Sequence, residues 1–353
     1  MMQAITIVTL STNETAGIRS VIENYLVSGL YDSYEHHWIK THDNVSAIEK
    51  IRIFIVSIFQ LLGVIRKKPI LHIHTSSRGS FLRKAILARI GSLFGSKTIL
   101  HLHGSEFKEF YEGSNKLAKK AIRYTFDHAD CVIVLSESWK VFVSSISINP
   151  NIEVVNNFVK EVQCSRRVGA EDGVNLLFMG RLGKRKGVYD LIDAMELVSR
   201  EVDNCKVYLC GDGELEEVKA RIGEKGLQEV CLVEGWVGPE AKPGYFSLAD
   251  VFVLLSYNEG LPMSILEAMS SGVAILTTPV GGIPEVIRPN QNGMLVEAGN
   301  VAEISRSIIE LSRDRENRTR LGRAARSDYL QSYCPDAILP KLHNIYTRLN
   351  KGG

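Results

Sequence analysis

The sequence lacks the patterns that would place it across a membrane or in a secretory compartment. Its longest strongly apolar segment, 53–65, has 13 residues, whereas a membrane-spanning helix needs about 20. The first residues show no basic region followed by a long apolar stretch, so no secretory signal is expected. The six cysteines form no Cys-x-x-Cys pair, which favours free thiols in a reducing compartment. We therefore expect a cytoplasmic protein.

Two ligand motifs are also missing. The sequence has no Asp-x-Asp pair, the arrangement that would hold a divalent ion under a diphosphate. The glycine pattern Gly211-Asp-Gly213 lacks the third glycine of a dinucleotide fingerprint, so it is weak evidence for a Rossmann cofactor. It serves equally well as a loop that approaches a nucleotide closely. We expect neither a bound metal nor a cofactor.

The pattern of elements predicts two doubly wound α/β domains. The 353 residues are 45% hydrophobic and 23% charged, which is ordinary for a globular protein of one or two domains. Short apolar runs alternate with helical patterns along the chain, and this alternation predicts parallel sheets with helices on both faces. Strands are predicted at 4–10, 70–75, 97–103, 131–135 and 152–155, and then at 174–179, 206–210, 230–234, 251–255, 273–277 and 294–296.

The predicted boundaries follow from changes in composition. Residues 160–172 are polar and lack periodicity, which suggests a linker. We expect one domain over 1–165, a second over 166–332, and a terminal segment over 333–353. That segment contains a helix from Pro335 to Leu349, which follows an aromatic hinge at Tyr329 and Tyr333.

Basic residues are concentrated in the first half of the chain. Residues 1–165 carry a net charge of +5 and the remainder −3, and 65–123 hold 13 basic against 3 acidic residues. Helices dense in Lys and Arg suit an anionic membrane surface. Ordinary solvated helix faces remain an alternative. Nucleic acid is less favoured, because the block lacks interleaved aromatic residues. The apolar helix predicted over 45–65 is either packed or interfacial.

The segment from Glu259 to Glu267 is the main candidate for a ligand site. It follows the apolar strand at 251–255, Pro262 suits the first turn of a helix, and Gly272 suits its exit. A helix N-terminus attracts phosphate, and carboxylates on either side suit sugar hydroxyls. The spacing alone also fits two solvated glutamates. In this context it indicates a nucleotide-sugar site.

Three further loops carry candidate residues. Arg181 and Lys186 lie in the loop after the strand at 174–179, where open α/β sheets bind ligands, and could neutralise a diphosphate. A solvated basic loop is the simpler alternative. Val237 follows the strand at 230–234, where backbone groups could read a base. Gly17 lies in the loop after the first strand and allows close approach of a ligand or only a tight turn.

Two His-x-His pairs occupy neighbouring predicted strands. His72 and His74 lie in one strand, and His101 and His103 in the next. Alternate positions share a face of a strand, so a zinc site is conceivable. We instead expect the pairs to mark strand ends, because no carboxylate or thiolate nearby in sequence completes a tetrahedral site. His103, at the carboxyl end of its strand, is the one expected to face a cleft.

Taken together, these residues resemble the large retaining glycosyltransferase family 4, which has the GT-B fold. The matching pieces occur in the family's order over about 120 residues and extend more weakly into the first half. They are Gly180-Arg181 with Lys186-Gly187, Gly211-Asp-Gly213, Ala249-Asp250, Glu259-Gly-Leu-Pro with Glu267-Ala, and Gly281-Gly282 with Glu285. The first half departs from the family where Thr15-Ala16-Gly17 stands in place of two adjacent glycines.

The resemblance implies a role for each matched residue. Arg181 and Lys186 would bind the donor diphosphate, Glu259 the sugar hydroxyls and Glu267 the ribose. His103 would lie near the donor sugar from the first domain, and the terminal helix would return to that domain. The remaining substrate-binding residues implied by the resemblance are Gly17, Gly211, Val237, Gly260, Leu261, Met263 and Ser264.

The implied activity is transfer of a hexosyl or N-acetylhexosaminyl group by a retaining, metal-independent glycosyltransferase. The donor is expected to be a UDP-sugar, with GDP-mannose next, and the acceptor a lipid-linked or oligosaccharide glycan in surface polysaccharide assembly. The expected location is the cytoplasm, peripheral on the inner face of the membrane. The alternatives are a nucleotide-sugar epimerase of the same fold and a nucleotide-sugar-binding protein without turnover.

Overall fold

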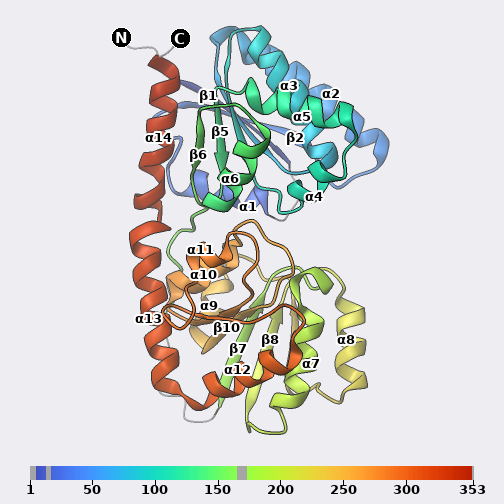
Figure 1. Cartoon of the computed structure of the whole chain (residues 1–353), viewed down its shortest axis with the longest axis vertical. Helices are drawn as coiled ribbons and strands as arrows, with labels where there is room; N and C mark the ends of the chain where they lie inside the picture. Colours follow the sequence, from blue (N-terminus) through green and yellow to red (C-terminus); the bar gives the residue numbers. More distant parts are fainter. Residues whose placement is uncertain (1–4, 13–16, 165–172, 352–353) are drawn as a thin grey trace. The chain divides into compact units, whose positions relative to one another are not determined.

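The computed structural model describes residues 5–12, 17–164 and 173–351. The chain forms two compact units (Figure 1): unit 1 comprises Met1–Phe158 and Pro335–Gly353, and unit 2 comprises Val159–Cys334. Each unit contains one six-stranded sheet. The expected domain boundary at 165 and most of the expected linker lie outside the described residues. All six cysteines are free thiols, as expected.

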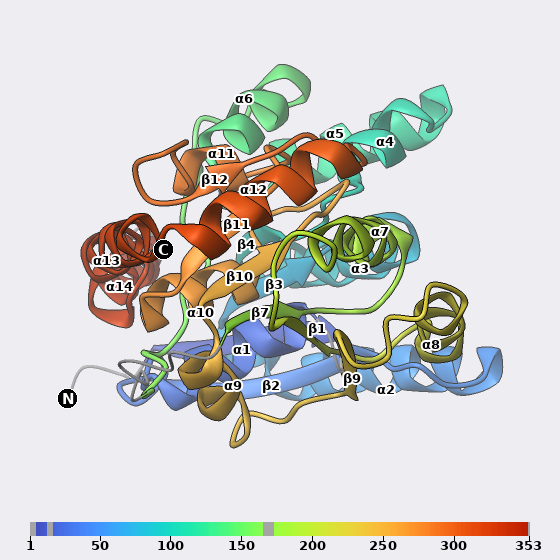
Figure 2. The same cartoon turned by 90° about the horizontal axis from the view of Figure 1, so that it is seen from below.

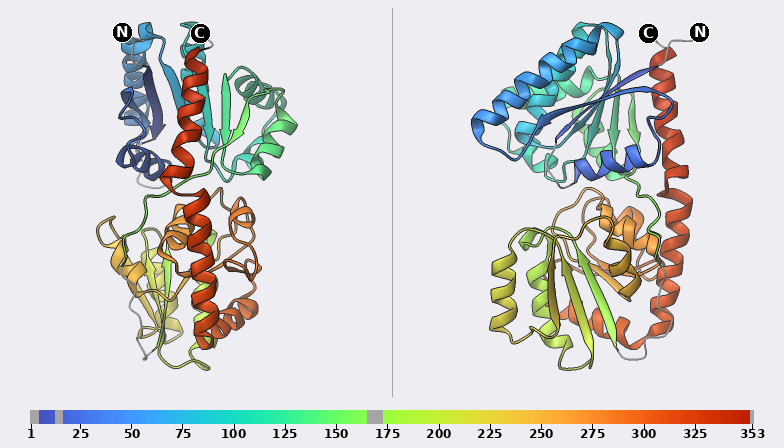
Figure 3. Two further views of the ribbon diagram at one scale, coloured as in Figure 1. Left: turned by 90° about the vertical axis from the view of Figure 1, so that its left-hand side faces the viewer. Right: turned by 180° about the vertical axis from the view of Figure 1, so that it is seen from behind.

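Unit 1 is built on a parallel sheet in the order β2-β1-β3-β4-β5-β6. Helices α2, α3 and α5 cover one face and α14 the other (Figure 3). The strands are β1 (Thr6–Thr12), β2 (Glu35–His42), β3 (Ile70–Thr75), β4 (Lys97–Leu102), β5 (Cys131–Val134) and β6 (Ile152–Val154). The helices are α1 (Ile18–Val27), α2 (Ala47–Val64), η1 (Ile65–Lys67), α3 (Arg78–Leu93), α4 (Phe107–Glu112), α5 (Lys116–Asp127), α6 (Glu137–Ile146) and α14 (Pro335–Lys351).

Strand β2 is an element that the sequence did not predict. Its sequence, Glu-His-His-Trp-Ile-Lys-Thr-His, is polar, and only two of its residues, Ile39 and Thr41, are buried. It lies at the edge of the sheet, and β1 is its single partner strand among the described residues. An edge strand covers less of the core than a central one, so it lacks the continuous apolar run that marks β1 and β3.

Unit 2 repeats the architecture with the strand order β12-β11-β10-β7-β8-β9, again all parallel. Helix α7 packs against α12, and α10 packs against α13 (Figure 2). The strands are β7 (Val174–Met179), β8 (Cys205–Cys210), β9 (Cys231–Gly235), β10 (Val251–Leu254), β11 (Ala274–Thr277) and β12 (Met294–Leu295). The helices are η2 (Lys184–Lys186), α7 (Val188–Val198), α8 (Leu215–Glu224), α9 (Lys242–Leu248), α10 (Met263–Ser271), α11 (Ile283–Val286), α12 (Val301–Arg313) and α13 (Arg315–Ser332).

Of the two residues in the expected aromatic hinge, Tyr333 lies at the break between α13 and α14, but Tyr329 does not. Tyr329 lies inside α13, fully buried, and its hydroxyl donates to the carbonyl of Val159 at 2.9 Å. Helix α13 was not predicted because nine of its eighteen residues have charged or amide side chains, and these obscure the spacing of the apolar residues that pack. Among the described residues, no helix combines the length and the hydropathy that a membrane crossing requires.

The centre of the unit 1 sheet contains four histidines rather than an all-apolar core. His72, His74 and His101 are fully buried, and His103 is partly so. The His72 ring bonds to Tyr346 of α14 through Nδ1 (2.7 Å) and to His101 through Nε2 (3.0 Å). His74, His101 and His103 lie at the carboxyl ends of β3 and β4 as expected, whereas His72 lies within β3. The sequence did not show that the four rings form one cluster, which ties α14 to β3 and β4.

Burial keeps these imidazoles uncharged. It lowers the pKa of His72 to about 3, with the charge of His103 as the next cause. It likewise lowers the pKa of His103 to about 3, assisted by the positive charge of Lys84. Burial, followed by the charges of neighbouring histidines, also lowers the pKa values of His74 and His101 well below 6.5. A neutral imidazole has one donor and one acceptor, which is what hydrogen bonds between rings require.

The cluster predicts that unit 1 is unusually sensitive to acid. An unfolded histidine titrates near 6.5, so between about pH 6.5 and 3 the unfolded state binds more protons than the folded state. The free energy of unfolding should therefore fall as the pH drops below 6.5, by about 1.4 kcal/mol per pH unit for each histidine. Hydrogen exchange of the β3 peptide, followed by mass spectrometry from pH 8 to 4.5, measures this loss.

A matched pair of variants identifies the source of the effect. His74→Asn keeps a polar amide near the Nδ1 position but cannot titrate. The free energy of unfolding should therefore fall less steeply with decreasing pH, by about 1.4 kcal/mol per pH unit, which is the contribution of one histidine. His128→Asn changes an exposed histidine and should leave the wild-type slope unchanged. Equal slopes in all three proteins would show that the cluster does not govern acid stability.

Candidate functional site

The candidate site lies at the carboxyl edge of the unit 2 sheet, around the point where the strand order reverses. Strand β7 pairs with β8 on one side and β10 on the other. The loops that follow β7 and β10 therefore emerge side by side, which is where open α/β sheets bind ligands. Two bonds join these loops: the Tyr257 amide donates to the carbonyl of Arg185 (2.9 Å), and Arg185 Nη1 donates to the carbonyl of Asn258 (3.1 Å).

A buried ion pair occupies this junction. The Glu259 side chain is 8% exposed and that of Lys186 is 14% exposed, and Lys186 Nζ donates to Glu259 Oε1. The same oxygen accepts from Ser256 Oγ at 2.8 Å, and Arg185 Nη1 lies 3.9 Å away. Glu259 Oε2 has no hydrogen-bond partner among the residues that the structure describes. One carboxylate oxygen is thus held by the protein while the other retains its acceptor capacity.

The sequence motifs predicted Lys186 and Glu259 as site residues but not their neighbours. The two residues were expected to contact different parts of a donor, whereas in the structure they contact each other directly. Ser256 and Arg185 also belong to this group. Both are adjacent to predicted motifs, but nothing local shows that Ser256 would face the carboxylate rather than solvent.

Loop β11–α11 fixes the backbone around Glu259. Gly281 has φ +58°, and a Cβ built on it would lie 1.8 Å from the carbonyl oxygen of Glu259. The Gly282 amide donates to the carbonyl of Gly260 at 2.7 Å. Thr278 Oγ1 donates to the carbonyl of Ser256. The two loops pack backbone against backbone, so only glycine fits at position 281.

Helix α10 begins at Met263, three residues after Gly260. Its N-cap is Pro262, which provides no side-chain hydrogen bond to the first amides. Leu261 is buried, and Met263 and Ser264, the first two residues of the helix, are partly exposed. The uncapped amides and the helix dipole give this position a partial positive charge, which favours an anion.

Glu267 is the fifth residue of α10, about one turn after Met263, and is partly buried. Its Oε1 accepts from Lys242 Nζ of α9 at 2.6 Å. The hydroxyls of Ser270 and Ser271 donate to its backbone carbonyl. Lys242 was missed by the sequence analysis, because its partner lies 25 residues away and no motif surrounds it.

The loops after β7 and β8 are joined as well. The Leu182 amide donates to the carbonyl of Asp212 at 2.6 Å, and a Cβ on Gly211 would lie 1.8 Å from the carbonyl oxygen of Gly180. Gly211 is therefore required by the packing of one loop on the other. Arg181, in the first loop, is exposed and forms no ion pair with any described residue. Val237, after β9, is partly exposed.

The two remaining predicted site residues belong to unit 1. Gly17 is exposed, with φ +65° and open space where a Cβ would stand. Residues 13–16 of the same loop, including Thr15 and Ala16, are outside the described part of the chain. His103 follows β4, where its backbone amide donates to the carbonyl of Thr75 (2.8 Å) and its Nε2 bonds to His74 Nδ1 (2.9 Å).

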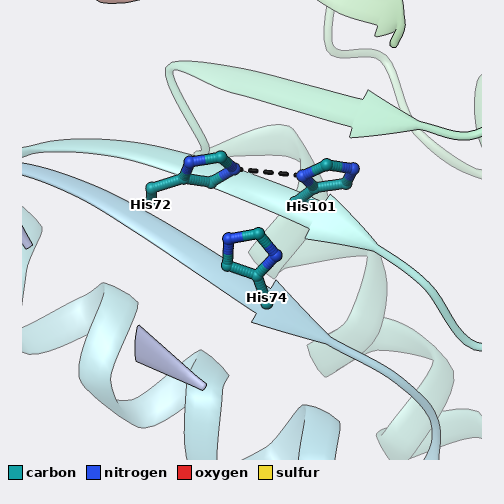
Figure 4. A group of neighbouring side chains, drawn as sticks. All are labelled: His72, His74 and His101. Atoms are coloured by element: carbon teal, nitrogen blue, oxygen red, sulfur yellow. Dashed lines mark hydrogen bonds between the residues drawn. The ribbon is translucent and has the colours of Figure 1, made fainter. Parts of the chain in front are cut away.

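Three of the clustered histidines could offer ligands to a metal ion. Figure 4 shows the rings of His72 and His101 joined by a hydrogen bond, with His74 beside them. One nitrogen from each ring lies within 4.8 Å of the others. The bonds among the rings, His103 and Tyr346 already account for most of their nitrogens, leaving Nε2 of His74 and of His101 buried and unpartnered among the described residues. The expectation of no bound metal stays a prediction.

Comparison with known proteins follows the division into two units. The model of glycosyltransferase family 4 matches residues 19–162, and the model of glycosyl transferases group 1 matches residues 165–328. The N-acetyl-alpha-D-glucosaminyl L-malate synthase of Bacillus anthracis is 27% identical over 288 residues, covering 78% of this chain and 74% of that protein. The lipopolysaccharide core biosynthesis glycosyltransferase LpsE of Rhizobium meliloti is 26% identical over 244 residues, covering 66% and 70%.

A solved structure supports the same fold. The Anabaena protein HepE, crystallised in complex with UDP-glucose, superposes with a TM-score of 0.79 at 15% identity, covering 98% of this chain and all of that one. The two parallel six-stranded sheets are the GT-B architecture that the sequence predicted, and this expectation is confirmed. Because the two family models follow one another over most of its length, the chain belongs to the glycosyltransferases, with a family 4 domain followed by a group 1 domain.

Proposed function

We propose that this glycosyltransferase transfers a hexosyl or N-acetylhexosaminyl group from a nucleoside-diphosphate sugar, with retention of configuration and without a metal ion. The favoured donor is a UDP-sugar, and GDP-mannose is the next candidate. The observation that carries the proposal is the Lys186–Glu259 pair beside the uncapped start of α10. It places a cation, a carboxylate and free amides at one edge of the sheet.

The cationic side of the site suits a departing diphosphate. Negative charge grows on the leaving group as the glycosidic bond breaks, so fixed positive groups stabilise the transition state more than the ground state. Lys186 supplies a partly buried ammonium, and the exposed Arg181 supplies a planar fork for phosphate oxygens. These charges, with the α10 amides, would do the work that a divalent ion does elsewhere.

The acidic side of the site suits the sugar. Glu259 Oε1 is occupied by Lys186 and Ser256, whereas Oε2 remains able to accept a hydrogen bond from a sugar hydroxyl. Glu267, held by Lys242, is assigned to the ribose hydroxyls. A carboxylate that already neutralises a buried lysine is a poor nucleophile. We therefore favour attack of the acceptor on the same face as departure, assisted by the leaving phosphate.

His103 enters this proposal as a neutral group. Its pKa of about 3 means that it carries no charge at physiological pH, so it would act near the donor sugar through hydrogen bonds and not as a cation. Its bond to His74 fixes the ring.

The proposed acceptor is a lipid-linked or oligosaccharide glycan in surface polysaccharide assembly, at the inner face of the cytoplasmic membrane. Support comes from the basic block at 65–123 and from the relative that acts in lipopolysaccharide core biosynthesis. The alternatives are a nucleotide-sugar epimerase and a binding protein without turnover. An epimerase would convert the donor without an acceptor, and a binding protein would show a calorimetric titration without product. Thermal-shift screening with UDP-, GDP- and ADP-sugars selects the donor for these assays.

Replacing Lys186 tests the leaving-group site. Lys186→Met removes the ammonium but keeps the aliphatic chain, so kcat/KM for donor turnover should fall by about 100- to 1,000-fold. Lys184→Met is the matched control, since Lys184 is exposed in the same loop and forms no ion pair with any described residue. Its turnover should stay within about threefold of wild type. Equal effects of the two substitutions would refute the assignment, and thermal unfolding of each variant shows whether loss of activity reflects loss of structure.

Replacing Glu267 tests the ribose site by a thermodynamic cycle that combines a change in the protein with a change in the ligand. A hydrogen bond to a charged group contributes about 1.5–3 kcal/mol, so wild-type protein should bind the nucleoside diphosphate roughly 10- to 100-fold more tightly than its 2′-deoxy analogue. In Glu267→Gln this difference should shrink to a few-fold, while Glu216→Gln, an exposed change on α8, preserves it. Titration calorimetry measures all six affinities. If Glu267→Gln showed the same difference in affinity between the two ligands as the wild type, Glu267 would not bind the ribose.

A further inference from the structure

Helix α2 exposes an apolar stripe that the unit 1 core does not use. Only Ser57 and Leu61 of its 18 residues are buried. Five large apolar side chains recur at spacings of three and four residues, which places them on one side of the helix. Phe59 is 69% exposed and Ile48 is 79% exposed. The stripe consists of Ile48, Ile51, Ile55, Phe59 and Leu62.

The helices that share this layer carry an apolar groove. Between α3 and α5 lies an open groove of about 470 Å³, lined mainly by apolar groups that include Ala85, Ile86 and Ala121. Arg89 lies over the ring of Tyr124 at 5.6 Å, and both line the groove. Leu82 and Leu93 of α3 are also more than 60% exposed. Helices α2, α3 and α5, which carry the stripe and line the groove, lie on the same side of the sheet (Figure 3).

Positive charge surrounds these apolar surfaces. The block from 65 to 123, which contains α3 and α5, has 13 basic and 3 acidic residues. Among its exposed cations are Arg66 and Lys68 at the end of α2, Arg89 in the groove, and Lys120 and Arg123 on α5. A surface that combines apolar and cationic groups is complementary to an amphiphile whose head is anionic.

The positive charge favours an anionic bilayer over a second copy of the chain as the partner of this surface. A second copy of the chain would bring two strongly positive faces together, which costs several kcal/mol for each close pair of like charges. An anionic bilayer offers opposite charge at its surface and apolar chains below it. The 18-residue helix is amphipathic and already packs one side on the sheet, so it can lie in the interface but cannot leave the unit to cross it.

We propose that the layer formed by α2, α3 and α5 docks on an anionic lipid bilayer. The α2 stripe enters the boundary between headgroups and acyl chains, and the α3–α5 groove receives one lipid chain while Arg89 pairs with its phosphate. This inference deepens the lipid-linked acceptor of the proposed function by identifying the face that contacts the lipid. Its test needs no turnover, so it fails or succeeds independently of the donor site.

Flotation with lipid vesicles tests the stripe. Wild-type protein should float with phosphatidylcholine vesicles that contain 30% phosphatidylglycerol at low salt, and much less with phosphatidylcholine alone or at high salt. Ile51→Glu combined with Phe59→Glu should lower the partition coefficient at least tenfold. Val27→Glu is the matched control: Val27 is 62% exposed on α1, outside this layer, and its variant should bind like wild type.

Quenching by brominated lipids tests the groove. In the Ile86→Trp variant, vesicles with brominated acyl chains should quench the added fluorescence strongly, and the same lipids should leave Val27→Trp unquenched. Flotation without quenching would show that the groove does not bind a lipid chain. Flotation unaffected by the α2 double substitution would show that the stripe does not insert into the bilayer. If the wild-type protein formed a dimer without lipid and the α2 double variant did not, the exposed stripe would be an interface with a second copy of the chain, and bilayer docking would be refuted. Calorimetry with the nucleoside diphosphate on the same preparations shows whether the donor site survives any of these failures.

Discussion

The buried ion pair between Lys186 and Glu259 is the constraint on which the unit 2 site depends. Removing two charges from water is costly, and attraction between them offsets that cost only when geometry is good and other hydrogen bonds assist. Here Ser256 supplies such a bond, and the loops after β7, β10 and β11 are joined through their backbones. A protein selected for stability alone could fill this junction with apolar side chains. Retaining a charged pair at the ligand edge of the sheet is reasonable when a substrate completes its hydrogen bonding.

Unit 1 shows the opposite use of polar residues. Four histidines lie in or directly after its central strands β3 and β4, and burial removes their charge instead of pairing it. Neutral rings can exchange hydrogen bonds with one another, and Tyr346 extends the set to α14. The terminal helix is therefore attached to β3 by a directional contact as well as by packing. In unit 2, the charged Lys186–Glu259 pair lies where the donor is expected to bind. In unit 1, positive charge is concentrated in the layer of α2, α3 and α5, where lipid is expected to bind.

The sequence predicted the fold and the main site residues where the signal is local. Pro262 and Gly272 correctly delimit α10, and the apolar run at 251–255 correctly locates β10. Prediction failed where structure depends on distant partners. The polar strand β2 is defined by pairing with β1, and the Lys242–Glu267 pair joins two helices. The exposure of α2 could not be predicted either, because the same apolar pattern is expected for a helix that packs in a core and for one that lies on a membrane.

The motif glycines explain why such sites can be recognised from sequence at all. A side chain at Gly211 would collide with the carbonyl of Gly180, and one at Gly281 with the carbonyl of Glu259. Both collisions are between loops of the protein, so the glycines are required whether or not a ligand is bound. What they fix is the path of the backbone that presents Arg181 and Glu259 at the sheet edge. The recognisable pattern therefore encodes the packing of one loop on another. The chemistry follows from the few charged side chains which that packing holds in place, and it can change with those side chains while the pattern persists.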